Sequence, residues 1–121
     1  MVDLNPEAAE AVAAELRGGG ACAIAIGVDV TDEAGVDAAV QRTVKELGGL
    51  DVLVSNAGIQ IVAPLQDFTF ANWKKLLAVH LDGAFLTSRA AMRQMISAGR
   101  GGAIIFMGSV HSKEASMLKA P

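Results

Sequence analysis

The sequence predicts an α/β fold in which a doubly wound parallel sheet is covered by helices in three α/β/α layers. Short apolar runs of strand length occur at 21–30, 50–55 and 103–107. Segments with apolar residues at helical spacing lie between them, and glycines close each helical segment. Strands that alternate with helices are typical of parallel βαβ units wound right-handedly.

The first strand and helix are predicted at 2–20. Val2, Asp3 and Leu4 have the character of a strand end, and Asn5 is a candidate N-cap. Pro6 then occupies the first helical position, where its missing N–H costs nothing. The three glycines at 18–20 predict the end of this helix.

The second unit begins with the apolar run 21–30, which predicts a strand buried on both faces. Cys22 lies in that run and is expected to be buried, because free cysteine is among the most buried residue types. Thr31 is the predicted N-cap of the following helix, which the glycines at 48–49 close.

The remaining elements are another buried strand at 50–55, a long helical region at 70–98 that starts near Asn72, and a strand at 103–107. Gly83 is a candidate join or kink in the long helix. No linker or repeat interrupts the pattern, so residues 1–121 are expected to form a single, partial domain. Three full strands make a thin sheet with unpaired edges.

Composition excludes several classes of function. A net charge of -3 without a basic cluster argues against nucleic acid as a partner. The apolar runs are too short to span a bilayer, and no secretory signal follows Met1, so a cytoplasmic location without membrane association is expected. The single cysteine cannot form an internal disulfide, and no metal site is predicted.

Small or polar residues follow each predicted strand. They are Asp3, then Asp29 and Val30, then the segment 55–58, then Gly108 and Ser109. Each alone is more often a turn former or a cap. Ligands bind beyond the carboxyl ends of strands in open parallel sheets, so four such positions in order predict a binding site there.

This series resembles the short-chain dehydrogenase/reductase family. The matching motifs are DVT at 29–31, SNAG at 55–58, where the family usually has NNAG, and IIFMGSV at 104–110. The resemblance covers essentially the whole chain. It implies a partial Rossmann-like domain that binds NAD, in an oxidoreductase that transfers hydride between NAD and a small substrate.

The resemblance assigns six residues to the cofactor. Asp3 would accept hydrogen bonds from both adenosine ribose hydroxyls and repel a 2′-phosphate, which implies NAD over NADP. Asp29 would bind the adenine amino group, and Val30 would pack on the ring. The alternatives are a strand-end cap for Asp3 and a helix-capping role for Asp29. The last three lie in the turn expected beneath the cofactor: Asn56, Ala57 and Gly58.

Ser109 matches the catalytic serine, which would donate to the substrate oxygen; the alternative is a turn serine. His80 stands where the family usually has an asparagine that supports a water in the proton relay, although a lone histidine on a helix is more often structural. The family's catalytic tyrosine follows that serine by thirteen residues. It is therefore expected at position 122, beyond Pro121, and the Gly-rich turn is expected before Met1.

Three further residues imply the substrate. Gln60, His111 and Lys119 match positions that hold the substrate carboxylate in D-3-hydroxybutyrate dehydrogenases of this family, so the predicted substrate is a small hydroxy acid or keto acid. His111 and Lys119 could equally be ordinary loop residues. The family's usual tetramer implies a homo-oligomer, with the long helix at the main contact. A truncated, non-catalytic chain with at most weak nucleotide binding is the alternative function.

Overall fold

The computed structural model describes residues 1–110, so His111 and Lys119 lie outside the described residues. The elements follow the predicted alternation of strands and helices. In chain order they are β1 (Val2–Asp3), α1 (Pro6–Gly18), β2 (Ile26–Gly27), α2 (Glu33–Leu47), β3 (Val52–Ser55), a 3₁₀ turn (Leu65–Asp67), α3 (Phe70–Leu77), a π-helical segment (Ala78–Asp82), α4 (Gly83–Ala98) and β4 (Ala103–Phe106).

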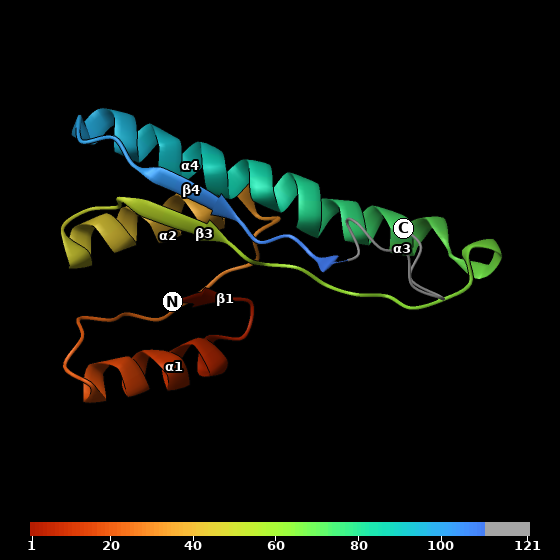
Figure 1. The fold of residues 1–121 in the computed structure, drawn as a ribbon, viewed down its shortest axis with the longest axis horizontal. Helices are drawn as coiled ribbons and strands as arrows, with labels where there is room; N and C mark the ends of the chain where they lie inside the picture. Colours follow the sequence, from red (N-terminus) through yellow and green to blue (C-terminus); the bar gives the residue numbers. More distant parts are fainter. Residues whose placement is uncertain (111–121) are drawn as a thin grey trace.

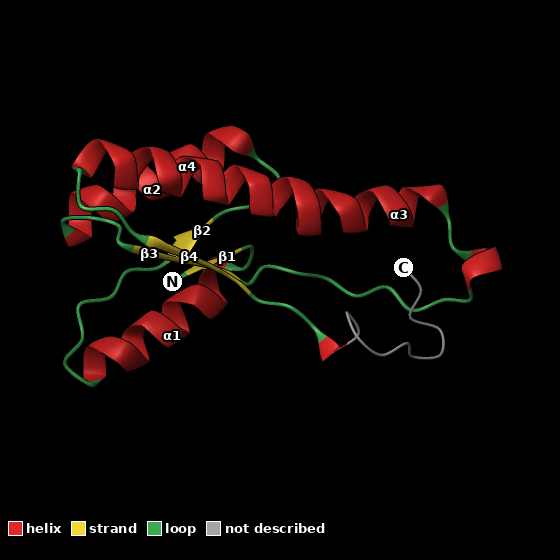
Figure 2. Ribbon diagram, turned by 45° about the horizontal axis from the view of Figure 1, so that its top comes forward, coloured by secondary structure: helices red, strands yellow, loops and turns green. Residues whose placement is uncertain are grey.

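The strands lie in a layer between helices, as Figures 1 and 2 show. α1 covers one side of the layer, and α2, α3 and α4 lie on the other. β1 pairs with β2 and β3 pairs with β4, and both pairs are parallel. This arrangement confirms the predicted α/β class with helices on both faces of a parallel sheet.

The two pairs form separate two-stranded sheets in the described part of the chain. β3 and β4 are joined over four residue pairs, from Val52 opposite Ala103 to Ser55 opposite Phe106. β1 and β2 are joined over two, Val2 with Ile26 and Asp3 with Gly27. The inner edges of β1 and β3 therefore carry no strand partner within residues 1–110.

Local chemistry explains where α1 and α2 begin. The Asn5 side chain accepts hydrogen bonds from the backbone N–H groups of Glu7 and Ala8, and Pro6 is the first helical residue, as predicted. For α2 the predicted cap was wrong by one residue. Asp32, rather than Thr31, caps the helix by accepting from the N–H of Ala34.

The predicted strand at 21–30 is much shorter than expected. Only Ile26 and Gly27 form β2, because β1 offers just two residues for pairing. Residues 21–25, which follow the end of α1, form no strand, and Cys22 among them is exposed rather than buried. An apolar run shows that burial is favourable, but strand length depends on the partner strand.

The long helical region starts at Phe70, capped by the Thr69 hydroxyl, two residues before the predicted start. It continues through the π-helical segment into α4 without a break. Gly83 was predicted as a join or a kink. It is the first residue of α4, so it marks the join with the π-helical segment, and its ordinary helical dihedrals show no kink. The irregular turn is the π-helical segment just before Gly83, where the Gly83 N–H donates a hydrogen bond to the Ala78 carbonyl.

The core is built from small side chains where helices meet the sheet and each other. Its buried apolar residues are Ala9, Ala13, Ile26, Val36, Ala39, Leu76, Ala90, Ala91 and Met95. The predicted burial of strands on both faces fails for β3, where Val52 and Val54 are each 52% exposed. α4 contacts β3 and α1 contacts β1 and β2, so the described helices leave part of β3 uncovered.

Candidate functional site

The predicted site residues lie at or just beyond the carboxyl ends of the strands. Asp3 is the last residue of β1, and Asp29 and Val30 come shortly after β2. Asn56 follows β3 directly, and Ser109 lies three residues beyond the end of β4. Because β3 and β4 end opposite each other, at Ser55 and Phe106, the segments that carry Asn56 and Ser109 leave the sheet side by side.

One stretch of helix brings the segments after β2 and β3 together. A Cβ atom on Gly83 would lie 2.7 Å from Val30 Cγ2, and one on Gly58 would lie 2.8 Å from His80 Cε1. His80 and Gly83 are three residues apart, which is about 4.5 Å along a helix. Val30 and Gly58 therefore pack against the same helical turn, and glycine at 58 and 83 permits that approach.

Asp3 is exposed and holds the turn into α1. Its Oδ1 accepts a hydrogen bond of 2.9 Å from the backbone N–H of Asn5. This is the strand-end capping role that the sequence left open. A carboxylate has two oxygens with about four acceptor sites, so the bond to Asn5 leaves capacity for further donors.

Asp29 is held by the next turn of the chain. Its Oδ1 accepts from the Thr31 backbone N–H at 2.9 Å and from the Thr31 hydroxyl at 2.8 Å. The backbone N–H of Thr31 and then its hydroxyl hold the pKa of Asp29 below the ordinary value for aspartate. Asp29 thus orders the entry to α2 and stays ionised at neutral pH.

An open pocket lies beside Asp29, between β2 and α2. Its volume is about 360 Å³. Gly27 and Gly35 form part of its wall, and Asp29, Asp32 and Arg42 bring both signs of charge to it.

His80 connects the long helix to the segment after β3. Its Nε2 atom lies 2.8 Å from the Ile59 carbonyl oxygen and 3.2 Å from the Ile59 backbone nitrogen. The sequence singled out His80 and Gln60 but missed Ile59, which lies between Gly58 and Gln60 and contributes only backbone atoms. No side-chain pattern could have indicated that contact.

The segments after β3 and β4 carry five of the predicted site residues, and all five are exposed. They are Asn56, Ala57, Gly58, Gln60 and Ser109. Within residues 1–110, no group of three His, Cys, Asp or Glu side chains could hold a metal ion. No helix among the same residues is long and apolar enough to cross a membrane.

The sequence profile of the short chain dehydrogenases matches residues 1–121. This chain belongs to the short-chain dehydrogenase family. D-threitol dehydrogenase of Mycolicibacterium smegmatis is 42% identical over 108 residues, a match that covers 89% of this chain and 41% of that enzyme.

Solved structures of the family share the fold. Gluconate 5-dehydrogenase from Burkholderia cenocepacia, in complex with NADP and tartrate, matches 99% of this chain and 47% of its own with a TM-score of 0.87 and 39% identity. NAD⁺-bound xylitol dehydrogenase matches 98% of this chain and 45% of its own, with a TM-score of 0.90 and 32% identity. The chain therefore spans less than half the length of each of these short-chain dehydrogenases.

Proposed function

We propose that this chain is the NAD-binding part of an oxidoreductase that transfers hydride between NAD and a hydroxyl-bearing small molecule, and that residues 1–121 form one partial domain. The packing of Val30 and Gly58 against one helical turn carries the proposal. It brings the segments after β2 and β3 to one surface, beyond the carboxyl ends of the strands, where α/β sheets bind nucleotides.

The residues present fit a dinucleotide. Asp3 offers an exposed carboxylate for the adenosine ribose hydroxyls, and Asp29 and Val30 offer a fixed carboxylate and an apolar side chain for the adenine. Ala57 and Gly58 have small or no side chains, so a ribose can lie close to the backbone. NAD would supply the hydride chemistry when bound.

In this proposal Ser109 orients the substrate by donating its hydroxyl hydrogen to the substrate oxygen. The backbone of His80 supports the water of the proton relay, and its ring holds the neighbouring segment. Gln60 contributes a carboxamide to the substrate side. His111 and Lys119 lie outside the described residues and are proposed for the substrate carboxylate from the resemblance alone.

The preference for NAD over NADP rests on the charge of Asp3, because a carboxylate repels a 2′-phosphate. Among the relatives, one structure contains NAD and another NADP. Calorimetric titration of this chain tests the choice. We expect saturable binding of NAD and binding of NADP at least tenfold weaker; tighter binding of NADP would contradict the proposal.

For the substrate, the proposal retains a small 3-hydroxy acid such as 3-hydroxybutyrate, on the strength of Gln60, His111 and Lys119. The names of the relatives favour a second candidate, a polyol or sugar acid, since they act on threitol, gluconate and xylitol. Oxidation assays with 3-hydroxybutyrate and with D-threitol, on a protein that includes the tyrosine expected at position 122, distinguish the two, and faster oxidation of D-threitol would favour the second candidate. A cytoplasmic location remains a prediction from the composition.

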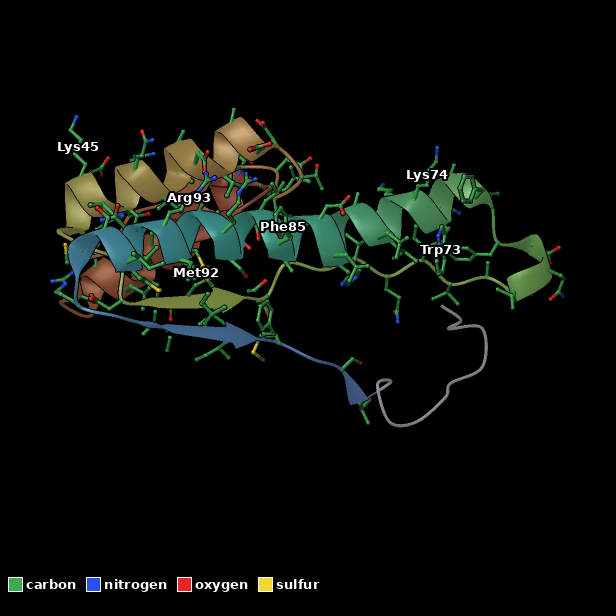
Figure 3. The ribbon with its side chains drawn as sticks, turned by 90° about the horizontal axis from the view of Figure 1, so that it is seen from above. Lys45, Trp73, Lys74, Phe85, Met92 and Arg93 are labelled. Carbon is green, nitrogen blue, oxygen red and sulfur yellow. The ribbon has the colours of Figure 1, made fainter. Side chains whose placement is uncertain are left out.

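The proposal includes a homo-oligomer, a tetramer as in the family, assembled through α4. Leu81, Phe85, Met92 and Ile96 recur at helical spacing and are exposed by 61%, 61%, 49% and 73%. Figure 3 shows Phe85 and Met92 along the helix seen from above. Exposed apolar residues at this spacing, on the π-helical segment and α4, suit a second copy of the same surface.

We expect the double substitution Met92→Lys and Ile96→Lys to shift the chain toward monomer, because two ammonium groups would be buried without partners. Sedimentation velocity measures the change. Leu65→Lys, at an apolar residue that is 67% exposed in the 3₁₀ turn, is the matched control. If the double variant and the control sediment alike, these apolar residues of α4 are not the contact.

A further inference from the structure

Arg89 lies on α4 and reaches across to the first residue of α2. Its Nη2 atom donates a hydrogen bond of 2.5 Å to Oε1 of Glu33, and the two side chains form an ion pair. The two helices lie side by side (Figure 3). The pair joins positions that are 56 residues apart in the sequence, so it ties the start of α2 to the side of α4.

The ring of Phe85 holds the guanidinium of Arg89 from a second side. Phe85 is one helical turn before Arg89, and the arginine Cζ lies 5.2 Å from the ring centroid. A guanidinium at this distance makes a cation–π contact. The Arg89 side chain is 25% exposed, and its Nε is buried without a hydrogen-bond partner among residues 1–110. The arginine is therefore packed against its neighbours rather than extended into water.

A tight turn links Glu33 to the residues proposed for the adenine. The side chain of Asp29 accepts hydrogen bonds from the N–H and the hydroxyl of Thr31, and its backbone carbonyl accepts one of 3.0 Å from the Asp32 N–H. Glu33 follows directly as the first residue of α2. These hydrogen bonds make the turn stiff, so a shift of Glu33 moves Asp29 and Val30 as well.

We propose that Arg89 is a positioning residue for the adenine end of the site: through Glu33 it holds the turn at 29–32 where that turn can meet the adenine amino group. The packing of Val30 on Gly83 fixes the turn at its centre, and the ion pair fixes it at its exit into α2. The inference deepens the proposed function and rests on it. Arg89 itself touches neither cofactor nor substrate, so its effect passes through Glu33.

Amide hydrogen exchange of the chain without NAD tests the contact. Arg89→Gln removes the cation and keeps a long polar side chain. An ion pair with an exposed partner contributes little, so we expect the Thr31 and Asp32 amides to exchange about threefold faster in this variant. Ala13 in α1 is expected to exchange as before, because the opening is local. Arg93→Gln removes the same charge one turn further along α4 and is the matched control, with no change expected at any of these amides.

Titration with two dinucleotides tests the role at the adenine. Nicotinamide hypoxanthine dinucleotide carries an oxygen in place of the adenine amino group of NAD. We expect the unmodified chain to prefer NAD about tenfold, and Arg89→Gln to prefer it only about threefold, because the turn no longer holds Asp29 in place. Arg89→Lys keeps a cation within reach of Glu33 and is expected to recover part of the preference. A role in general stability alone would leave the preference unchanged.

A double-mutant cycle tests whether Arg89 acts through Glu33. We expect Glu33→Gln to lower the preference for NAD as much as Arg89→Gln does. The double variant is expected to be no worse than either single variant, because each substitution removes the same ion pair.

Four results would each overturn the inference: unchanged exchange at Thr31 and Asp32 in Arg89→Gln, faster exchange at Ala13 as well, an unmodified chain that binds both dinucleotides equally, or additive losses in the double variant. The proposed function fails separately, if the unmodified chain binds neither dinucleotide while Arg89→Gln still speeds exchange at the turn.

Discussion

Replacing Gly102 with alanine is expected to destabilise the chain by about 1–3 kcal/mol, the usual cost of forcing an extra carbon into a packed site. A Cβ there would lie 2.8 Å from the Asp51 carbonyl oxygen and closer still to the sulfur of buried Met95. That carbonyl accepts the Ala103 N–H, which opens the β3–β4 pairing. The new methyl group therefore disturbs the core and the sheet at once.

Urea unfolding followed by circular dichroism measures the loss as a lower midpoint. Gly18→Ala is the control, since a Cβ at that helical residue meets nothing within 4 Å. Alanine favours the helix there, so this variant is expected to be as stable as the unmodified chain or up to about 1 kcal/mol more stable. A midpoint for Gly102→Ala equal to that of the unmodified chain would show that the backbone at Gly102 does not lie against Met95 and Asp51 as described.

The second large effect is expected for Asp3→Asn. The side-chain oxygen of the new asparagine can still accept a hydrogen bond from the Asn5 N–H, so the turn into α1 keeps its cap. The asparagine carboxamide is neutral, however, and accepts hydrogen bonds from the two ribose hydroxyls poorly. Loss of hydrogen bonds to a charged group costs about 1.5–3 kcal/mol, so NAD should bind about 10- to 100-fold more weakly.

The same variant removes the repulsion of a 2′-phosphate, so NADP should bind as well as NAD or better. Calorimetric titration with both dinucleotides gives the two affinities. Asp67→Asn, an exposed aspartate in the 3₁₀ turn, controls for the change in net charge. An unchanged preference for NAD in Asp3→Asn would mean that this residue serves only as a strand-end cap.

Features that depend on neighbouring residues were predictable from the sequence. Asn5 and Pro6 begin α1 as expected, because an N-cap and its first turn interact locally. The order of strands and helices also follows from the spacing of apolar residues, and the motifs at 29–31, 55–58 and 104–110 indicated the family that the sequence profile confirms.

Features that depend on distant residues were not predictable. β2 is short because β1 is short, and Val52 and Val54 are half exposed because the described helices leave part of β3 uncovered. The partner of His80 is a backbone group twenty-one residues away, which carries no side-chain signal. Gly83 was predicted as a join or a kink and does begin α4, but nothing in the sequence indicated that its lack of a side chain permits the approach of Val30.

The central claim is that the segments after β1, β2 and β3 together bind the dinucleotide. The most direct measurement is a titration of the ¹⁵N-labelled chain with NAD, followed by the amide signals. We predict that saturable shifts concentrate at residues 3–5, 28–31 and 56–60. Shifts confined to residues of α2 and α4, or no shifts at millimolar NAD from a folded chain, would contradict the claim.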